Sequence, residues 1–168
     1  MSYISVKRTC IGIAAVLLAL SGPLSCSRPP AEQSEPVSAI GPRVNQPLRS
    51  FNQVIQSSVH NLTVSVNEQF DVPVRIENPG TEIWASAGSA PINVSYEWFR
   101  NGKRLSIEGE RTSLPKPVGP KTFADVILRV VGLDEPGKYE LRITLVQESV
   151  AWFTTKGANY LAIPVLIR

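Results

Sequence analysis

The feature that most constrains the fold is a period-two alternation of apolar and polar residues, which recurs from about Asn61 to the C-terminus. Between Phe70 and Ile76 apolar side chains occupy the even positions, whereas Asp71 and Arg75 have the opposite parity. Alternation of this kind is typical of a β-strand with one buried face. No stretch offers an apolar stripe at helical spacing. The alternating sets are Leu62 to Val66, Phe70 to Ile76, Ile92 to Trp98, Ala124 to Val130, Tyr139 to Leu145 and Leu161 to Ile167.

Turn-forming residues separate these sets. The sequences NPGTE at 78–82, RNGK at 100–103, EPGK at 135–138 and TKGAN at 155–159 combine glycine with asparagine, proline or charged residues, as tight turns do. Six or seven short antiparallel strands, each with one apolar face, predict an all-β fold of two packed sheets.

The stretch LDEPGKYEL, Leu133 to Leu141, indicates the immunoglobulin-like form of this β-sandwich. In such domains a tyrosine near the start of strand F hydrogen-bonds back to upstream backbone and closes the corner between two strands. Tyr139 is placed for that role, and Gly137 is expected to supply an unusual backbone angle in the turn. Leu141 stands where an antibody domain has a cysteine. Hydrophobic packing alone must therefore join the sheets, and Trp98 is expected to fill the space between them.

The N-terminus, MSYISVKRTCIGIAAVLLALSGPLSC, has the layout of a secretory signal. Lys7 and Arg8 precede an apolar run from Ile11 to Leu20, and Gly22 and Pro23 follow it. A permanent transmembrane helix is the alternative, but such a helix takes about 20 apolar residues to span a bilayer. We therefore expect the protein to be exported.

Cysteine usage refines this expectation. Only Cys10 and Cys26 occur, so the exported part has no internal disulfide. The residues PLSC resemble the lipobox of bacterial lipoproteins, in which the cysteine becomes the first mature residue and carries acyl groups; Pro23 stands where leucine is usual. The alternative is an ordinary signal with a stray cysteine. We expect residues 1–25 to be a lipoprotein signal peptide and Cys26 to carry palmitate-type acyl chains that anchor the protein to a membrane.

Residues 26–58 are rich in proline, serine and glutamine and poor in apolar side chains. This composition predicts a flexible tether. The patch FNQVI at 51–55 is the exception, because it could pack on the domain as an extra strand. The immunoglobulin-like β-sandwich itself is predicted to span residues 59–168.

Charge and residue inventory argue against two classes of function. The formal net charge of +3 falls to +1 when Lys7 and Arg8 leave with the signal, so no nucleic-acid partner is expected. His60 is the only histidine and the domain has no cysteine, so neither a histidine-based triad nor a thiolate site can form. Glu108 and Glu110 are most simply solvated charges, and no metal-ligand spacing is visible. We expect no enzyme activity, cofactor or metal.

Three segments, NPGTEIWASAGSAPINVSYEWF, ERTSLPKPVGP and EPGKYELRITLVQESVAWF, resemble an immunoglobulin-like module of bacterial cell-surface polysaccharide synthesis and export. In that family the module is appended to glycosyltransferases, methyltransferases and transporter subunits. The resemblance implies binding of a glycan or an envelope partner rather than chemistry. Matching positions are Asn78, Gly80, Trp84, Tyr96, Trp98, Arg111, Thr112, Leu114, Pro115, Pro120, Gly137, Tyr139, Leu145, Glu148, Val150, Trp152, Phe153 and Gly157.

The side chains in the connections have two interpretations each. Trp84 follows a turn and is most simply a lid over one end of the core, but an exposed indole can also stack on a sugar face. Trp152 and Phe153 are adjacent, so in a regular strand only one of them points into the core. Arg111 and Glu148 are candidates for ligand contact, although a mutual ion pair that anchors the RTSLP loop is the simpler role.

The sequence thus predicts a non-catalytic, membrane-tethered module of the bacterial cell envelope that binds a surface glycan or polysaccharide. The alternative is a protein-interaction or assembly accessory subunit that docks on another envelope protein through Trp152 and Phe153. A pair of exposed rings beside a groove favours a sugar, and a flat apolar patch favours a protein. The candidate ligand-binding residues are Trp84, Arg111, Glu148, Trp152 and Phe153, and the structural residues are Tyr96, Trp98, Gly137, Tyr139 and Leu141.

The residue after the predicted lipidation site bears on the membrane that receives the anchor. Ser27 follows Cys26, and it is not the aspartate that retains lipoproteins at the inner membrane. We therefore expect an outer-membrane lipoprotein whose domain faces the periplasm.

Overall fold

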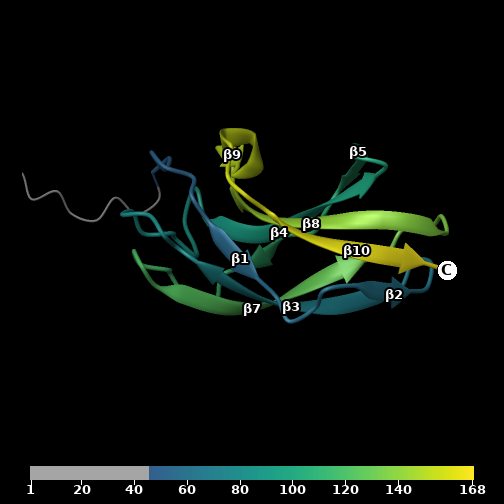
Figure 1. Cartoon of the computed structure of the whole chain (residues 1–168). Helices are drawn as coiled ribbons and strands as arrows, with labels where there is room; N and C mark the ends of the chain where they lie inside the picture. The colour runs from purple at the N-terminus through teal and green to yellow at the C-terminus, as the bar shows by residue number, and fades with distance from the viewer. Residues whose placement is uncertain (1–45) are drawn as a thin grey trace, which may run out of the picture. The chain divides into compact units, whose positions relative to one another are not determined.

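The computed structural model describes residues 46–168, which form strands joined by turns (Figure 1). Most predicted alternating sets lie in strands with one buried face; between Gln69 and Glu77, for example, Val72, Val74 and Ile76 are buried. The set from Ile92 to Trp98 differs, because its strand is buried on both faces, and the set from Leu62 ends as a strand at Val64. The elements are β1 (Val54–Gln56), β2 (Leu62–Val64), β3 (Gln69–Glu77), β4 (Ile92–Arg100), β5 (Lys103–Glu108), β6 (Thr112–Ser113), β7 (Phe123–Val131), β8 (Gly137–Gln147), β9 (Ala151–Trp152), the 3₁₀ helix η1 (Thr154–Lys156) and β10 (Leu161–Ile167).

The strands form two sheets that pack face to face. The first sheet has the strand order β1-β3-β7, and the second has the order β2-β10-β8-β4-β5, with β6 beside β4 and β9 beside β8. β2 runs parallel to β10, whereas the other paired strands are antiparallel. This arrangement is an immunoglobulin-like β-sandwich, so the predicted all-β fold class is confirmed.

The core lies between the sheets, and residues 46–168 contain no cysteine that could link them. Trp98 on β4 is completely buried, and the rings of Tyr96 and Tyr139 meet its ring edge-on at centroid distances of 6.3 and 6.1 Å. Leu141, at the position of the missing cysteine, is also fully buried and stands opposite Trp98 in the β4–β8 register. Trp98 therefore takes the predicted place between the sheets.

Tyr139 closes the corner at the start of β8. Its hydroxyl donates a hydrogen bond to the backbone oxygen of Glu135 at 3.1 Å, which confirms the predicted tyrosine corner. Gly137 has the unusual backbone angle that was expected, because its φ of 157° lies in a region that L side chains rarely adopt. A Cβ there would lie 3.3 Å from both the guanidinium of Arg100 and the Tyr139 ring. Gly137 thus leaves room for the tyrosine to fold over the turn.

Replacing Tyr139 with phenylalanine should lower the free energy of unfolding by about 0.5–1.5 kcal/mol, because the ring keeps its packing while the Glu135 carbonyl loses its donor. Chemical denaturation followed by tryptophan fluorescence measures the difference. Tyr160→Phe is the matched control, since Tyr160 is 42% exposed and should tolerate the loss of its hydroxyl. An equal change in the two variants would mean that the corner hydrogen bond adds nothing to stability.

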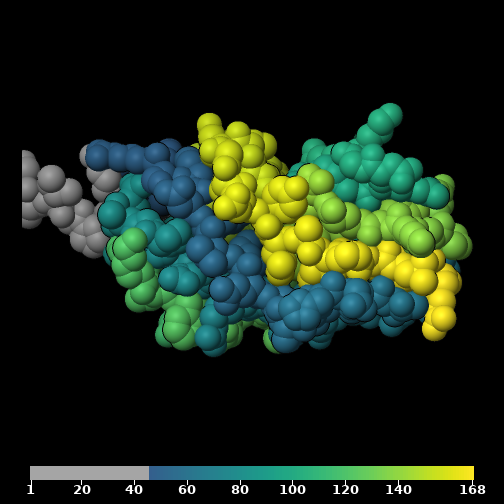
Figure 2. Space-filling model, in the orientation of Figure 1, coloured from purple at the N-terminus to yellow at the C-terminus, as the bar shows by residue number. Residues whose placement is uncertain are grey.

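The described part of the predicted tether is folded onto the domain. β1 pairs with β3, as the FNQVI patch suggested, and Leu48 is buried. Figure 2 shows this N-terminal segment, in blue, against the yellow C-terminal part of the chain. The prediction that the tether extends to residue 58 is therefore corrected for residues 46–58.

Amide side chains hold this segment in place. The Gln53 side chain donates to Oγ1 of Thr144 at 2.8 Å and accepts from the backbone N–H of Leu145 at 2.9 Å. The backbone N–H of Leu48 donates to Oε1 of Gln147 at 2.9 Å. These buried amides bind β8 specifically, which a composition-based prediction of flexibility does not detect.

The predicted signal peptide, residues 1–25, and the predicted lipidation site Cys26 lie outside the described residues, as does the tether up to residue 45. Within residues 46–168, no helix has the length and apolar character needed to cross a membrane.

Candidate functional site

Two of the predicted ligand-binding aromatic residues belong to the core. Trp84 is 2% exposed and Phe153 is completely buried, and their rings meet edge-on with centroids 5.8 Å apart. The Trp84 backbone also pairs with Val118 through two hydrogen bonds of 3.0 Å. Neither ring can offer its face to a ligand, so the candidate list is corrected for both residues. Trp84 is the lid over one end of the core that its position after a turn suggested.

Trp152 remains partly exposed, at the end of β9. Phe153, the next residue, points into the core, so the prediction that these neighbours face opposite ways is confirmed. The turn into η1 holds this arrangement, because the Phe153 N–H donates to the Leu145 oxygen at 2.9 Å and Oγ1 of Thr155 donates to the Trp152 oxygen at 2.7 Å. Of the three predicted aromatic residues, Trp152 is therefore the one available to a ligand.

Arg111 is the centre of a polar cluster beside Trp152. Its Nε donates to Oε1 of Glu148 at 3.0 Å, which confirms the predicted ion pair between these two residues. Its Nη1 donates to Oγ of Ser95 at 3.1 Å and to the Gly109 oxygen at 2.8 Å. The guanidinium carbon lies 4.6 Å from the centroid of the Trp152 ring, which is a cation–π contact. Arg111 thereby fixes the loop before β6 against β9.

Asn93 on β4 also belongs to this cluster. Its Nδ2 donates to Oε1 of Glu148 at 2.8 Å, so the Glu148 carboxylate accepts from both Asn93 and Arg111. Its Oδ1 is buried and has no hydrogen-bond partner among residues 46–168. A buried acceptor without a protein partner is uncommon in folded proteins.

A second group of aromatic and charged residues lies further along the same face of β4. Arg142 on β8 stacks between two rings: its guanidinium carbon is 3.7 Å from the centroid of Phe99 and 4.4 Å from that of Tyr160. Glu97 and Arg104 form an ion pair of 2.6 Å beside them. These residues line a groove of about 330 Å³, together with Thr154, Thr155 and Ala158.

Phe99, Arg142 and Tyr160 were not predicted from the sequence as site residues. Phe99 follows the core residue Trp98, so the alternation already placed it on the outer face, but its neighbours depend on the pairing of β4 with β8. That register puts Phe99 opposite Glu140, two residue pairs from Arg142 opposite Glu97. The signal for this group is therefore the parity of β4, whose outward positions 93, 95, 97 and 99 are three polar residues and an aromatic one.

We call the combined surface the outer strip. It is made of the outward residues of β4 and the side chains that pack beside them from β5, β8, β9 and the connections just before β6, after β8 and before β10. Its guanidinium groups are matched by carboxylates in ion pairs, so it carries little net charge. Its members are Asn93, Ser95, Glu97, Phe99, Arg104, Glu108, Arg111, Glu140, Arg142, Glu148, Trp152 and Tyr160.

Among residues 46–168, no three histidine, cysteine, aspartate or glutamate side chains are grouped so that they could hold a metal ion. The chemistry available at the outer strip is hydrogen bonding by fixed carboxylates and guanidinium groups, and stacking on partly exposed rings.

Comparisons with known proteins found similar solved structures but no family. No protein-family model matches the chain, and no curated protein matches it. Similar solved structures include the CARDB domain of a Pyrococcus furiosus protein, which is 17% identical, with 69% of this chain and 92% of that chain covered and a TM-score of 0.39. SSP-19, an MSP-domain-like protein of Caenorhabditis elegans, is 15% identical, with coverage of 64% and 92% and a TM-score of 0.28.

A third similar structure is a complex of titin with an obscurin-like 1 immunoglobulin domain, at 16% identity, with 69% of this chain and 92% of that chain covered and a TM-score of 0.27. Likenesses at these identities concern the fold alone. The chain is an immunoglobulin-like β-sandwich domain.

Proposed function

We propose that the protein is a non-catalytic module of the bacterial cell envelope that binds a surface glycan or polysaccharide along the outer strip. The lipobox-like PLSC sequence supports an acyl anchor at Cys26 and an exported location, and Ser27 after it supports the outer membrane with the domain facing the periplasm. The chain resembles modules of polysaccharide synthesis and export, and Arg111, Glu148 and Trp152 are among the matching positions. This resemblance supports a glycan as the ligand.

The observation that carries this proposal is the pair of rings, Phe99 and Tyr160, that flanks the groove around Arg142. Flat rings stack on the apolar faces of sugars, and the fixed guanidinium and carboxylate groups between them pair with sugar hydroxyls. Asn93, Ser95 and Glu97 on β4 are themselves buried, so a sugar would contact the partly exposed side chains beside them, which are Phe99, Arg142, Trp152 and Tyr160.

The alternative, an assembly accessory subunit that docks through Trp152 and Phe153, has less support. Phe153 is completely buried, so this edge presents one aromatic ring instead of two. The polar character of the outer strip also differs from the apolar centre that stable protein interfaces use.

Calorimetric titration of the full chain, in detergent, with short oligosaccharides from bacterial surface polysaccharides tests the proposal. Tyr160→Ala and Trp152→Ala should each weaken binding about tenfold, because each removes one stacking ring. Phe123→Ala is the matched control: Phe123 is 51% exposed but belongs to the other sheet, so its loss should leave affinity unchanged. Absence of binding down to millimolar affinity, together with crosslinking of Trp152 to another envelope protein in cells, would replace the glycan with the alternative.

A further inference from the structure

The first sheet ends in a long strand, β7, that is hydrogen-bonded to another strand along one edge only, although β6 approaches it. β7 is the last strand in the order β1-β3-β7, and within residues 46–168 no strand pairs with its other edge. Figure 1 shows β7 along the rim of the sandwich. Its nine residues, FADVILRVV, include no proline, lysine or glycine, and its register with β3 has no bulge. Natural proteins use such devices to prevent edge strands from pairing with other chains.

The hydrogen-bonding phase of β7 shows which residues face the open edge. In an antiparallel pair, residues alternate between turning both backbone groups toward the partner strand and turning both away. The Asn78 N–H donates to the Thr122 oxygen at 2.9 Å, so even-numbered residues of β7 bond to β3. The N–H of Val131 points away from β3, because it donates to the Tyr96 hydroxyl at 3.1 Å. Residues 123, 125, 127 and 129 therefore turn their N–H and C=O groups toward the open edge.

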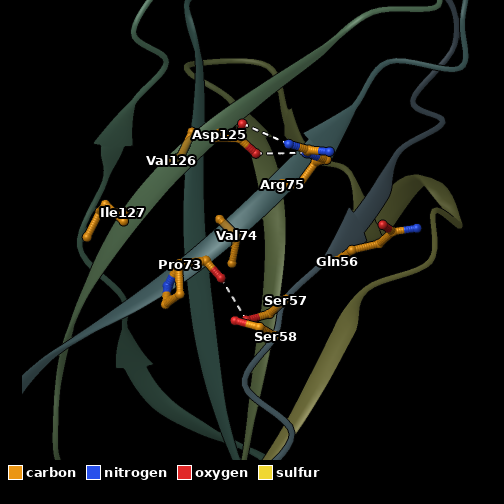
Figure 3. A pocket seen from close by; sticks show the side chains of 9 residues that line it. All are labelled: Gln56, Ser57, Ser58, Pro73, Val74, Arg75, Asp125, Val126 and Ile127. Atoms are coloured by element: carbon orange, nitrogen blue, oxygen red, sulfur yellow. Dashed lines mark hydrogen bonds and ion pairs between the residues drawn. The ribbon is translucent and has the colours of Figure 1, made fainter.

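The same odd-numbered residues place their side chains on the outer face of the sheet. Phe123 and Ile127 are 51% and 58% exposed, the two highest values among the large apolar side chains of the described residues. Asp125 lies between these two residues and Arg129 follows Ile127 on the same face; both are exposed. Figure 3 shows Ile127 and Asp125 beside a hollow of about 560 Å³ that also borders Arg75 on β3. An uncovered strand with exposed apolar residues is suited to pairing with another strand.

The order of charges along β7 is complementary to itself. If two copies of β7 pair antiparallel about a two-fold axis at Ile127, Asp125 stands opposite the partner's Arg129, and Arg129 stands opposite the partner's Asp125. Ile127 then meets its own copy. An axis at Asp125 or at Arg129 would instead set like charges against each other, which is destabilising.

The neighbouring strand extends this complementarity. Arg75 donates two hydrogen bonds to Asp125, at 2.8 and 3.0 Å, and the hydrogen bonding lowers the pKa of the Asp125 carboxyl below its ordinary value, so it is ionised at neutral pH. On the same sheet Arg129 pairs with Asp71 at 3.4 Å. In the paired arrangement charges would alternate across four strands, from Arg75 through Asp125 and the partner's Arg129 to the partner's Asp71.

We propose that two copies of this protein associate through antiparallel pairing of β7 with β7, centred on Ile127, which joins their three-stranded sheets into one sheet of six strands. The contact surface is isologous, as a two-fold dimer requires. It lies on the sheet opposite the outer strip and does not depend on glycan binding, so a dimer would present two glycan-binding strips.

Cysteine crosslinking of the full chain in membranes tests the register. In Ile127→Cys, the two introduced thiols would stand directly opposite, with Cα atoms about 5.5 Å apart, within the range of a disulfide. Mild oxidation should yield a covalent dimer. Phe123→Cys is the matched control: it is similarly exposed, but the proposed register separates its two copies by eight residues, about 27 Å, so oxidation should not crosslink it. The unsubstituted chain shows any contribution from Cys26.

Charge variants in the Ile127→Cys background test the complementarity. Asp125→Arg and Arg129→Asp each set like charges together and should reduce the crosslinked fraction at least about tenfold. An equimolar mixture of the two variants should restore it, because the introduced arginine then faces the introduced aspartate. Both side chains are more than 60% exposed, so folding, checked by circular dichroism, should be unaffected.

Several results would overturn the proposal. These are equal crosslinking at positions 123 and 127, no crosslink at 127 in the unmodified charge background, or failure of the mixture to recover the dimer. Capture of a different envelope protein by the cysteine at 127, without the homodimer, would assign the edge to another partner.

Discussion

Trp98→Ala should lower the free energy of unfolding by about 3–5 kcal/mol, the range for removal of a large buried aromatic side chain. Trp98 is completely buried between two sheets that no disulfide joins, and it meets Tyr96 and Tyr139 edge-on. Domains of ordinary size have about 5–15 kcal/mol of stability in total, so the variant should be largely unfolded at moderate denaturant concentrations. Urea titration followed by circular dichroism measures the shift.

The control for this prediction is Trp98→Phe. It keeps a ring between the sheets and removes an indole N–H that has no hydrogen-bond partner among residues 46–168, so it should cost clearly less than alanine. If phenylalanine and alanine destabilise the domain equally, the indole would act through something other than the volume that it fills.

Phe153→Ala should also cost about 3–5 kcal/mol, whereas Trp152→Ala should cost less than about 1 kcal/mol. The two residues are neighbours in sequence, but the Phe153 ring is fully buried against Phe51 and Trp84, with centroid distances of 5.1 and 5.8 Å. Trp152 is partly exposed, and its ring contacts the guanidinium of Arg111. Thermal melts of the two variants beside the unsubstituted chain compare these costs directly.

Comparing these two variants also distinguishes an effect on stability from an effect on ligand binding. Trp152→Ala should retain the fold while its affinity for oligosaccharide falls, and Phe153→Ala should lose stability first. A stable Phe153→Ala domain would contradict the assignment of this ring to the core, because a cavity of that size cannot be neutral in a well-packed interior.

The sandwich could be predicted from the sequence because each long strand has one apolar face. Parity alone separated the buried positions 72, 74 and 76 from Asp71 and Arg75, and the acidic–glycine–tyrosine order before Leu141 located the corner. β5 gave no comparable signal, because Lys103, Arg104 and their neighbours are mostly exposed on both faces. β6 and β9 are too short to show a period.

The candidate site was less accessible to such reasoning, because it depends on strand pairing. The Arg111–Glu148 pair could be anticipated as a contact between two loops. The stacking of Arg142 between Phe99 and Tyr160 follows from the register of β4 against β8 and from the path of the chain into β10. Alternation states that a residue faces outward, but it does not state which residue of a distant strand stands beside it.

The burial of Trp84 and Phe153 illustrates the same limit for connections. Both lie outside the long strands, where no periodicity indicates which side chains turn inward. Trp84 is held by its backbone pairing with Val118, and Phe153 by the hydrogen bond of its N–H to Leu145. The first contact joins two segments that are far apart in sequence, and the second depends on a tight turn. Composition and spacing therefore do not predict whether either ring points inward.

The amide contacts of the N-terminal segment determine how a pulling force enters the domain. A force applied to the chain ahead of residue 46 reaches Leu48 and Gln53 first, and their hydrogen bonds pass the load to Gln147, Thr144 and Leu145 on β8, the central strand of its sheet. Drag on a bound polymer at the outer strip would act on that same strand through Arg142. If the N-terminus is anchored and the outer strip binds a polymer, as proposed, load would run between them through one strand, without opening the contact between the two sheets.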